Sequence, residues 1–276
     1  VHTNDTIMRL EEFPQRLVVL GGGVVAAEFS HVFSALGAQV YQVVRSNRIL
    51  REVDKEVVDR FVEAASHQWN ILLERSLVEI RENGDGTVTV VVEHDGEVEE
   101  IVADAVLAAT GRRSNSDTLK ASSFFDVDSR GFIGTDKYQR VLYNGSPVPG
   151  VFALGDVSSP FQLKHVANHE ARTVQHNLSH PDSFVASDHR FVPAAVFSNP
   201  QIATVGLSEE NARKLGEREG FKVTVKSQNY GDTAYGWAME DSVGLAKLIA
   251  RKDTGQLLGA HLVGEEASVL IQPLLH

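Results

Sequence analysis

Residues 16–26 read Arg16-Leu17-Val18-Val19-Leu20-Gly21-Gly22-Gly23-Val24-Val25-Ala26, and this stretch decides the fold of the first part of the chain. A short apolar run meets three glycines, and the periodic stretch 24–36 then predicts a helix that Gly37 closes. A second apolar run at 40–44 has the composition of a buried parallel strand. The first 45 residues are therefore predicted to form a βαβ unit with a glycine turn before its helix.

The glycine turn has the spacing of a dinucleotide-binding fingerprint. Gly21 permits the tight turn, Gly23 lets the backbone approach a pyrophosphate, and Ala26 is small enough for close helix packing. The helix that starts at Val24 and Val25 would direct its free N–H groups and its positive dipole end toward that pyrophosphate. The alternative is a glycine turn that binds nothing, which the βαβ context disfavours.

The end of the second strand indicates which nicotinamide cofactor binds. An NAD site usually has a carboxylate there for the ribose hydroxyl, whereas an NADP site has cations for the 2′-phosphate. The chain has Arg45, Arg48 and Arg51, and the first acid is Glu52. Arginine forms charge-assisted and often bidentate contacts with phosphate, so the pattern favours NADPH. The alternative is a solvated basic patch.

The rest of the chain divides into further α/β segments. Residues 77–103 alternate with period two between glycine turns and predict an antiparallel meander. A strand ending in Gly155-Asp156 and a helix over 166–178 follow, and from Asp188 strands alternate with a helix that Ser208 caps. We predict an NADPH-binding domain at 1–113, the C-terminal part of an FAD-binding domain at 114–187 and an α+β interface domain at 188–276.

Composition excludes several classes of function. The 276 residues carry a net charge of -11, which repels nucleic acid backbones and anionic lipid surfaces. The longest apolar runs fall far short of the ~20 residues that a membrane span needs. No signal peptide is visible, and a cytoplasmic location is expected. The chain has no cysteine, so these residues offer no thiol nucleophile and no thiolate metal ligand.

Several motifs in order resemble the flavoprotein disulfide reductases, a family that includes glutathione reductase and dihydrolipoamide dehydrogenase. They are the glycine turn with Glu28, the pair Arg45 and Arg51, Ala109-Thr110-Gly111-Arg112, and Gly155-Asp156. The stretch 192–207, with Asn199-Pro200 inside it, looks like the start of the family's dimer-interface domain. The resemblance covers nearly the whole chain and implies two Rossmann-like nucleotide-binding domains and a homodimer.

Within this family, three segments look most like the mycothione reductase subgroup: residues 165–171, 188–190 and 230–241. The resemblance implies that NADPH passes hydride to FAD, that the reduced flavin reduces a nearby cystine, and that mycothione, a small-molecule disulfide, is the final acceptor. Asp156 resembles the aspartate that bonds a flavin ribitol hydroxyl, and the backbone of Lys164, His165 and Val166 would face the flavin pyrimidine edge. Glu28 resembles the glutamate that pairs with a lysine beside the flavin.

Together, the fingerprint and the resemblance give one set of predicted cofactor contacts. These are Gly21, Gly23, Val24, Val25, Glu28, Arg45, Arg51, Gly111, Asp156, Lys164, His165 and Val166.

The chain departs from the family pattern in three ways. Ala26 replaces the third glycine, and Val24 stands where several relatives have a tyrosine that covers the nicotinamide pocket. The family's first FAD fingerprint, its CxxxxC pair and its terminal His-Pro and Glu segment have no counterpart here. We therefore expect a chain truncated at both ends, with no catalytic residue beyond a supporting role for Glu28, and no disulfide reduction by the 276 residues alone.

Other readings remain open at this point. The parent could be an NADP transhydrogenase or flavin oxidase relative, or the chain could be a non-catalytic NADPH-binding dimerisation module. The histidine pairs 165/169 and 176/180 have metal-ligand spacing on a helix, but no third ligand is evident and no metal site is predicted. Tyr235 and Trp237 are expected at an interface or in a core, and His276 has no assigned role.

Overall fold

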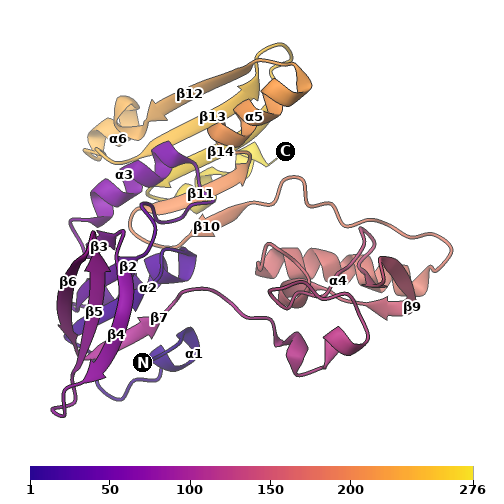
Figure 1. Cartoon of the computed structure of the whole chain (residues 1–276). Coiled ribbons are helices and arrows are strands. Elements are labelled where there is room, and N and C mark those ends of the chain that lie inside the picture. Colours follow the sequence, from indigo (N-terminus) through magenta and orange to yellow (C-terminus); the bar gives the residue numbers. More distant parts are fainter. Residues whose placement is uncertain (276) are drawn as a thin grey trace. The chain divides into compact units, whose positions relative to one another are not determined.

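The computed structural model describes residues 1–275, and His276 lies outside the described residues. The chain forms two compact units (Figure 1). The first unit contains Val1–Gly111 and the chain from Pro193 onward, and the second contains Arg112–Val192. The division into three domains at residues 113 and 187 stays a prediction.

A parallel sheet with the order β3-β2-β1-β7 forms the centre of the dinucleotide-binding region. Helix α2 begins directly after the glycine turn, and α3 follows the arginine segment, as the fingerprint predicts. Among the elements of this region are α1 (Asn4–Ile7), β1 (Arg16–Leu20), α2 (Val24–Ala35), β2 (Gln39–Val44), α3 (Lys55–Ala65), β3 (Asn70–Leu73) and β7 (Ala105–Ala108).

An antiparallel meander covers one face of this sheet. Its strands are β4 (Ser76–Glu82), β5 (Val88–His94) and β6 (Glu97–Ala103). Alternate residues of the central strand β5, such as Val90 and Val92, pack on Val18, Val43 and Val106 of the parallel sheet. Thr89 and Val91 are buried as well, so the burial of β5 does not alternate, although the meander that the sequence pattern predicted is present.

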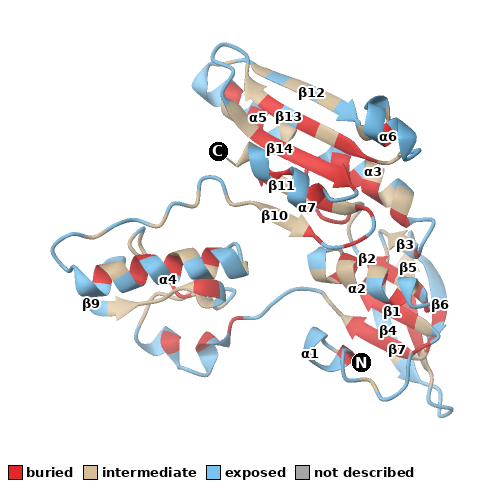
Figure 2. Cartoon of the chain, turned by 180° about the vertical axis from the view of Figure 1, so that it is seen from behind, coloured by how far each residue is buried: buried red, intermediate tan, exposed pale blue. Residues whose placement is uncertain are grey.

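The chain from Pro193 onward forms a five-stranded antiparallel sheet with the order β10-β11-β14-β13-β12. Its buried residues Val196, Ile202, Leu245 and Val263 belong to the same hydrophobic cluster as the parallel sheet and its helices, and Figure 2 shows burial along the strands of both sheets. A shared core fixes the two sheets relative to each other within this unit. Its elements include β10 (Ala194–Val196), β11 (Gln201–Gly206), α5 (Glu209–Glu219), β12 (Val223–Asn229), α6 (Ala234–Ala238), β13 (Leu245–Arg251), β14 (Leu257–Gly264) and α7 (Ala267–Leu270).

Local chemistry explains the bounds of helix α5. Ser208 caps its start, because its hydroxyl accepts a hydrogen bond from the backbone N–H of Asn211. The helix ends at Gly220, which has the left-handed φ of +77° that favours glycine.

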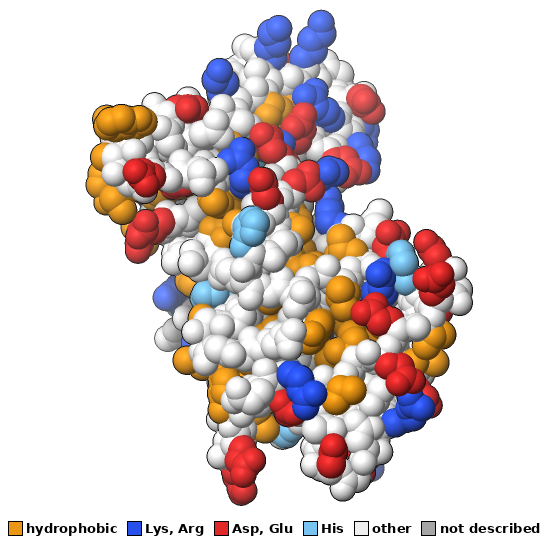
Figure 3. Space-filling view, turned by 90° about the vertical axis from the view of Figure 1, so that its left-hand side faces the viewer, with side chains coloured by type: hydrophobic (Ala, Val, Ile, Leu, Met, Phe, Trp, Pro, Cys, Tyr) orange, Lys and Arg blue, Asp and Glu red, His pale blue; other side chains and the backbone are white. Residues whose placement is uncertain are grey.

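Basic and acidic side chains are interspersed over the face that Figure 3 shows. The net charge of -11 is therefore not gathered there in one acidic patch.

The second unit is built around helix α4 (Lys164–Ser179) and the hairpin of β8 (Arg140–Tyr143) and β9 (Ser146–Phe152). Three short 3-10 helices, η1 (Asn115–Asp117), η2 (Ala121–Ser123) and η3 (Gly155–Val157), connect these elements. Its small core comprises Ala121, Ile133 and Val141 with Val151, Ala153 and Val157 packed against them. Strand β9 ends at Phe152, whereas the sequence pattern predicted that this strand continues to Gly155.

The structure overturns one reading of the aromatic pair. Tyr235 and Trp237 on α6 are 76% and 77% exposed, so the expectation that they lie in a core is wrong.

Within residues 1–275, none of the helices is both long and apolar enough to cross a bilayer.

Candidate functional site

The three glycines of the turn differ in what surrounds them. A Cβ built on Gly21 would lie 2.3 Å from the carbonyl oxygen of Ala109, and Gly21 has a φ of +138°. A Cβ on Gly22 would lie 2.8 Å from the Val44 side chain, whereas one on Gly23 would have no atom within 4 Å. Gly21 is therefore required by the fold itself, a Cβ at Gly22 would force the Val44 side chain to shift, and Gly23 leaves open space at the start of α2.

Buried polar groups support the turn from below. The Gln42 side chain is fully buried, and its amide donates to the carbonyl oxygen of Gly21 at 3.0 Å. The indole N–H of Trp69 donates to Gln42 Oε1 at 3.0 Å, and the Leu50 N–H donates to the Gly22 carbonyl at 2.7 Å. Since each buried polar group has its partner, the turn is held in one conformation.

A cavity of about 600 Å³ opens above this turn at the carboxyl ends of β1, β2 and β7. Ligands bind at this end of the strands in open α/β sheets. Of the predicted contacts, Gly21, Gly23, Val24, Arg45, Arg51 and Gly111 line the cavity, and Val25 and Glu28 do not. Ser46, Arg48 and Thr110 also line it.

The charge of this cavity comes from its three arginines. Arg45, Arg48 and Arg51 line it together with a single acidic residue, Glu52. Across residues 1–275, none of the three arginines forms an ion pair within 4.0 Å of a carboxylate. Arg48 donates to the backbone carbonyl of Arg51 at 2.5 Å, which holds the segment as a compact loop. The cavity therefore presents an excess of positive charge suited to an anionic ligand.

Glu28 lies on α2 outside this cavity. Its carboxylate accepts a hydrogen bond from the backbone N–H of Phe197 at 2.9 Å, which links α2 to the chain after β10. Burial raises the pKa of Glu28, and the Phe197 N–H partly offsets this effect. Glu28 also borders an apolar pocket of about 720 Å³, where Met8 and Phe13 are exposed. The predicted pairing of Glu28 with a lysine beside a flavin stays a prediction.

In the second unit, Asp156 stands on η3 close to Arg112. Arg112 Nη2 lies 3.0 Å from Asp156 Oδ2, and both side chains are about half exposed. The neighbouring Gly155 donates its N–H to Glu170 of α4 at 2.6 Å. A Cβ on Gly155 would lie 3.3 Å from the Ala167 Cβ, and its φ is +70°. The Gly155-Asp156 pair is therefore fixed against the first turns of α4.

The start of α4 leaves backbone donors without an intrahelical partner. Lys164, His165 and Val166 are the first three residues of the helix, and the cap residue Leu163 makes no side-chain capping bond. The N–H groups of a first turn have no carbonyl to bond within the helix. Lys164 and His165 are exposed and Val166 is buried, so this end can receive a partly negative group.

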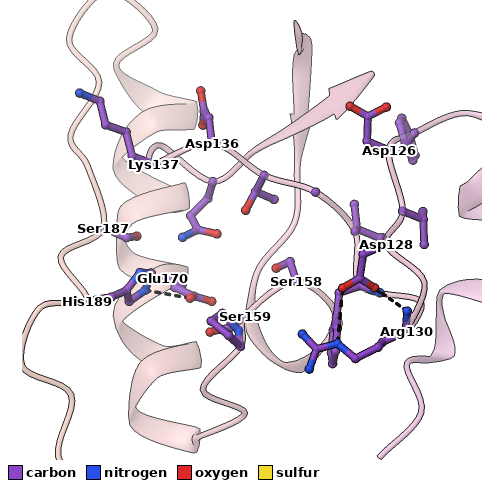
Figure 4. A pocket seen from close by; sticks show the side chains of 18 residues that line it. Asp126, Asp128, Arg130, Asp136, Lys137, Ser158, Ser159, Glu170, Ser187 and His189 are labelled. Atoms are coloured by element: carbon purple, nitrogen blue, oxygen red, sulfur yellow. Dashed lines mark hydrogen bonds and ion pairs between the residues drawn. The ribbon is translucent and has the colours of Figure 1, made fainter. Parts of the chain in front are cut away.

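A pocket of about 840 Å³ in the second unit does not include the predicted flavin contacts. Figure 4 shows Glu170 and His189 pointing toward one another in it. Glu170 is 1% exposed, and its Oε1 lies 2.9 Å from His189 Nε2. The sequence analysis did not single out Glu170, although its i,i+4 spacing from Val166 places it on the buried face of the helix.

Three of the four paired histidines on and next to α4 bond to the backbone. The rings of His176 and His180 stack with their centroids 4.4 Å apart. A ring nitrogen of His176 lies 3.1 Å from the Ser183 carbonyl oxygen, and one of His180 lies 3.1 Å from the His176 carbonyl oxygen. His169 Nε2 accepts from the Asp188 N–H at 3.2 Å. Among the residues that the structure describes, no group of three or more potential ligand side chains could hold a metal ion.

A buried charge cluster lies beside the arginine loop, and the sequence analysis missed it. Asp54, which is 2% exposed, caps α3 by accepting from the Glu56 N–H at 3.1 Å, and it accepts from the Glu209 N–H at 2.9 Å. Lys247 Nζ lies 2.9 Å from Asp54, 3.0 Å from Glu56 and 2.7 Å from Glu209. A sequence signal was present, because Lys247 occupies an inward position between Leu245 and Ile249 on β13.

This cluster predicts a loss of stability in acid. Burial would raise the pKa of Asp54, but the Glu209 N–H and Lys247 outweigh it and lower that pKa, and Lys247 with Arg213 lowers the pKa of Glu209. Carboxylates with lowered folded pKa values stabilise the fold above their unfolded values, and this stability is lost as pH falls through the folded values. We expect the free energy of unfolding from urea titrations to fall below about pH 5. The Asp54→Asn variant should lose less over this range; parallel curves for variant and wild type would contradict this expectation.

Comparison with known proteins identifies the family. Residues 1–171 match the family described as pyridine nucleotide-disulphide oxidoreductase, and residues 192–275 match its dimerisation domain. The chain belongs to this family. Mycothione reductase of Mycobacterium tuberculosis is 49% identical over 99% of the chain, and dihydrolipoyl dehydrogenase of Synechocystis is 32% identical over 99%.

Structural similarity agrees with the family assignment. The HOCl-induced flavoprotein disulfide reductase RclA from Escherichia coli matches 99% of the chain and 60% of its own, with a TM-score of 0.85 and 25% identity. The chain spans 58% of the length of both curated relatives named above. The predicted fold class, with Rossmann-like nucleotide-binding domains and a dimerisation domain, is confirmed by these matches.

Proposed function

We propose that the protein containing these residues is an NADPH-dependent FAD enzyme that reduces a low-molecular-weight disulfide, with mycothione as the substrate. The observation that carries this proposal is the cavity at Gly23, where three unpaired arginines meet a dinucleotide fingerprint. The family match restricts the chemistry to pyridine nucleotide-dependent disulfide reduction and its relatives.

The cavity fits NADPH. The open space over Gly23 and the first N–H groups of α2, at Val24 and Val25, would receive the pyrophosphate. Arg45 and Arg51 would bond the 2′-phosphate, with Arg48 adding positive charge. Gly111, which also has open space where a Cβ would be, would let the chain after β7 border the ligand.

The second unit offers groups that fit a flavin. The free N–H groups of Lys164, His165 and Val166 would face the electron-rich edge of the ring system. Asp156 accepts from Arg112 through Oδ2, which leaves Oδ1 to accept from a ribitol hydroxyl. Bound FAD would supply two-electron transfer between the nicotinamide and a cystine of the complete protein.

Mycothione is the substrate proposed within this chemistry. Its support is the 49% identity to mycothione reductase of Mycobacterium tuberculosis and the three segments that look like that subgroup, at 165–171, 188–190 and 230–241.

The activity of the complete protein tests the proposal. We expect NADPH oxidation with mycothione to be faster than with glutathione disulfide or lipoamide, and FAD to copurify. The chain of 276 residues, which has no cysteine, serves as the control and should not exceed the free-flavin background. NADPH oxidation without any disulfide, or hydride exchange between nicotinamides alone, would favour an oxidase or a transhydrogenase instead. NADPH binding with no turnover would favour a binding module.

We also propose that the protein is a homodimer joined through the domain at 192–275. The match to the family's dimerisation domain supports this proposal. Light scattering of the complete protein should give twice the mass of one chain at micromolar concentration. A mass of one chain over the whole concentration range would contradict the homodimer.

A further inference from the structure

The arginine loop lies between two pockets. Arg48 and Arg51 line the cavity at the glycine turn, and both also line a second pocket of about 480 Å³. The second pocket is bordered by Asp54, Glu209 and Lys247, so it lies between the dinucleotide-binding region and the C-terminal sheet. Two of the three arginines proposed for the 2′-phosphate, Arg48 and Arg51, are therefore neighbours of the buried charge cluster.

Asp54 joins this cluster to the loop. The loop turns back at residues 50–53, where the Val53 N–H donates to the Leu50 carbonyl at 2.9 Å. Asp54 follows directly and is held by donors from three elements: the Glu56 N–H of α3, the Glu209 N–H of α5 and Lys247 of β13. One end of the arginine loop is thus fixed by groups of the C-terminal domain.

Lys247 is the buried cation of the cluster. It is 3% exposed, and it contacts three carboxylates at 2.7–3.0 Å, of which Glu209 also bonds Arg213. Without the lysine charge, the three carboxylates would repel one another and seek other cations. Of the other cations that line this pocket, Lys55 is paired with Asp59 and Arg213 with Glu209. Arg48 and Arg51 also line it and have no carboxylate partner within residues 1–275, so they are the cations free to approach the cluster.

We propose that Lys247 is a positioning residue for cofactor specificity: its charge holds Asp54, Glu56 and Glu209 and offsets part of their negative charge, and it so keeps Arg48 and Arg51 available for the 2′-phosphate of NADPH. This inference rests on the proposed NADPH function. It assigns to the C-terminal domain a role in reading the cofactor that binds to the N-terminal domain. A purely structural role of Lys247 would instead affect NADPH and NADH alike.

The test compares the dissociation constants of NADPH and NADH for four proteins. These are the wild type, Lys247→Met, Lys247→Arg and the control Lys226→Met, which removes an exposed lysine from the neighbouring strand β12. In Lys247→Met we expect the preference for NADPH over NADH to fall roughly fivefold or more, because couplings between two sites usually change affinity by at least about this factor. The dissociation constant of NADH should change little. Lys247→Arg keeps the charge and should restore most of the preference, and Lys226→Met should match the wild type.

Two results would overturn the proposal: an unchanged preference in Lys247→Met, or an equal loss of affinity for both nucleotides. If Lys247→Met does not fold, amide hydrogen exchange of the wild type decides, because coupling between sites is reciprocal. Bound NADPH should then slow amide exchange at residues 208–212, where the Glu209 N–H bonds Asp54, and bound NADH should slow it less. Equal protection by both nucleotides would overturn the proposal. Equal affinity of the wild type for NADPH and NADH would contradict the proposed NADPH preference itself. The wild-type measurement therefore distinguishes a wrong cofactor assignment from a wrong role for Lys247.

Discussion

Replacing Arg45 or Arg51 by alanine should reduce the preference for NADPH over NADH by roughly tenfold or more in each variant, since a hydrogen bond to a charged group contributes about 1.5–3 kcal/mol. Both arginines line the cavity at the glycine turn and have no carboxylate partner within residues 1–275. Their loss would remove a partner of the 2′-phosphate without leaving a buried anion unpaired. Binding of NADH, which lacks this phosphate, should change little.

Titration of each variant with both nucleotides measures this effect. Arg218→Ala is a suitable control, because Arg218 is an exposed arginine of α5 that does not line the cavity. Superimposable NADPH and NADH curves for the wild type would contradict the assignment of the arginines to the 2′-phosphate. An unchanged preference in both alanine variants would also contradict it.

Substitution of Gly21 and of Gly23 should separate folding from nucleotide binding. In Gly21→Ala, the new Cβ would overlap the Ala109 carbonyl at 2.3 Å and the residue would keep a positive φ, which together should cost about 2–5 kcal/mol of stability. In Gly23→Ala, the new Cβ would meet no protein atom, and an alanine at this cap position should cost less than about 1 kcal/mol.

The effect of Gly23→Ala on binding should be much larger than its effect on stability. The methyl group would occupy the space in which the pyrophosphate is proposed to approach the backbone, so affinity for both nucleotides should fall roughly tenfold or more through lost charge-assisted hydrogen bonds. Thermal unfolding and nucleotide titration of both variants test this prediction. Unchanged affinity in a folded Gly23→Ala variant would show that the dinucleotide does not lie over this glycine.

The helix bounds show where local sequence suffices and where it does not. The start of α2 after the glycine turn and the cap at Ser208 were predicted correctly, because they depend on backbone conformation and capping within a few residues. Apolar residues with helical spacing run over 53–69, whereas α3 spans only Lys55–Ala65. Asp54 caps its start, and Trp69 lies beyond its end with its indole bonded to Gln42.

The sequence by itself determined the family, the order of the elements and the set of residues at the glycine turn, because each of these depends on short-range patterns. Only the tertiary structure decided which glycine faces open space and how Arg48 and Arg51 come to lie beside a buried charge cluster. Lys247 and Asp54 are 193 positions apart, and nothing in their local sequence pairs them. Burial makes such pairings strong, since charges removed from water must find partners wherever the packed elements bring them together.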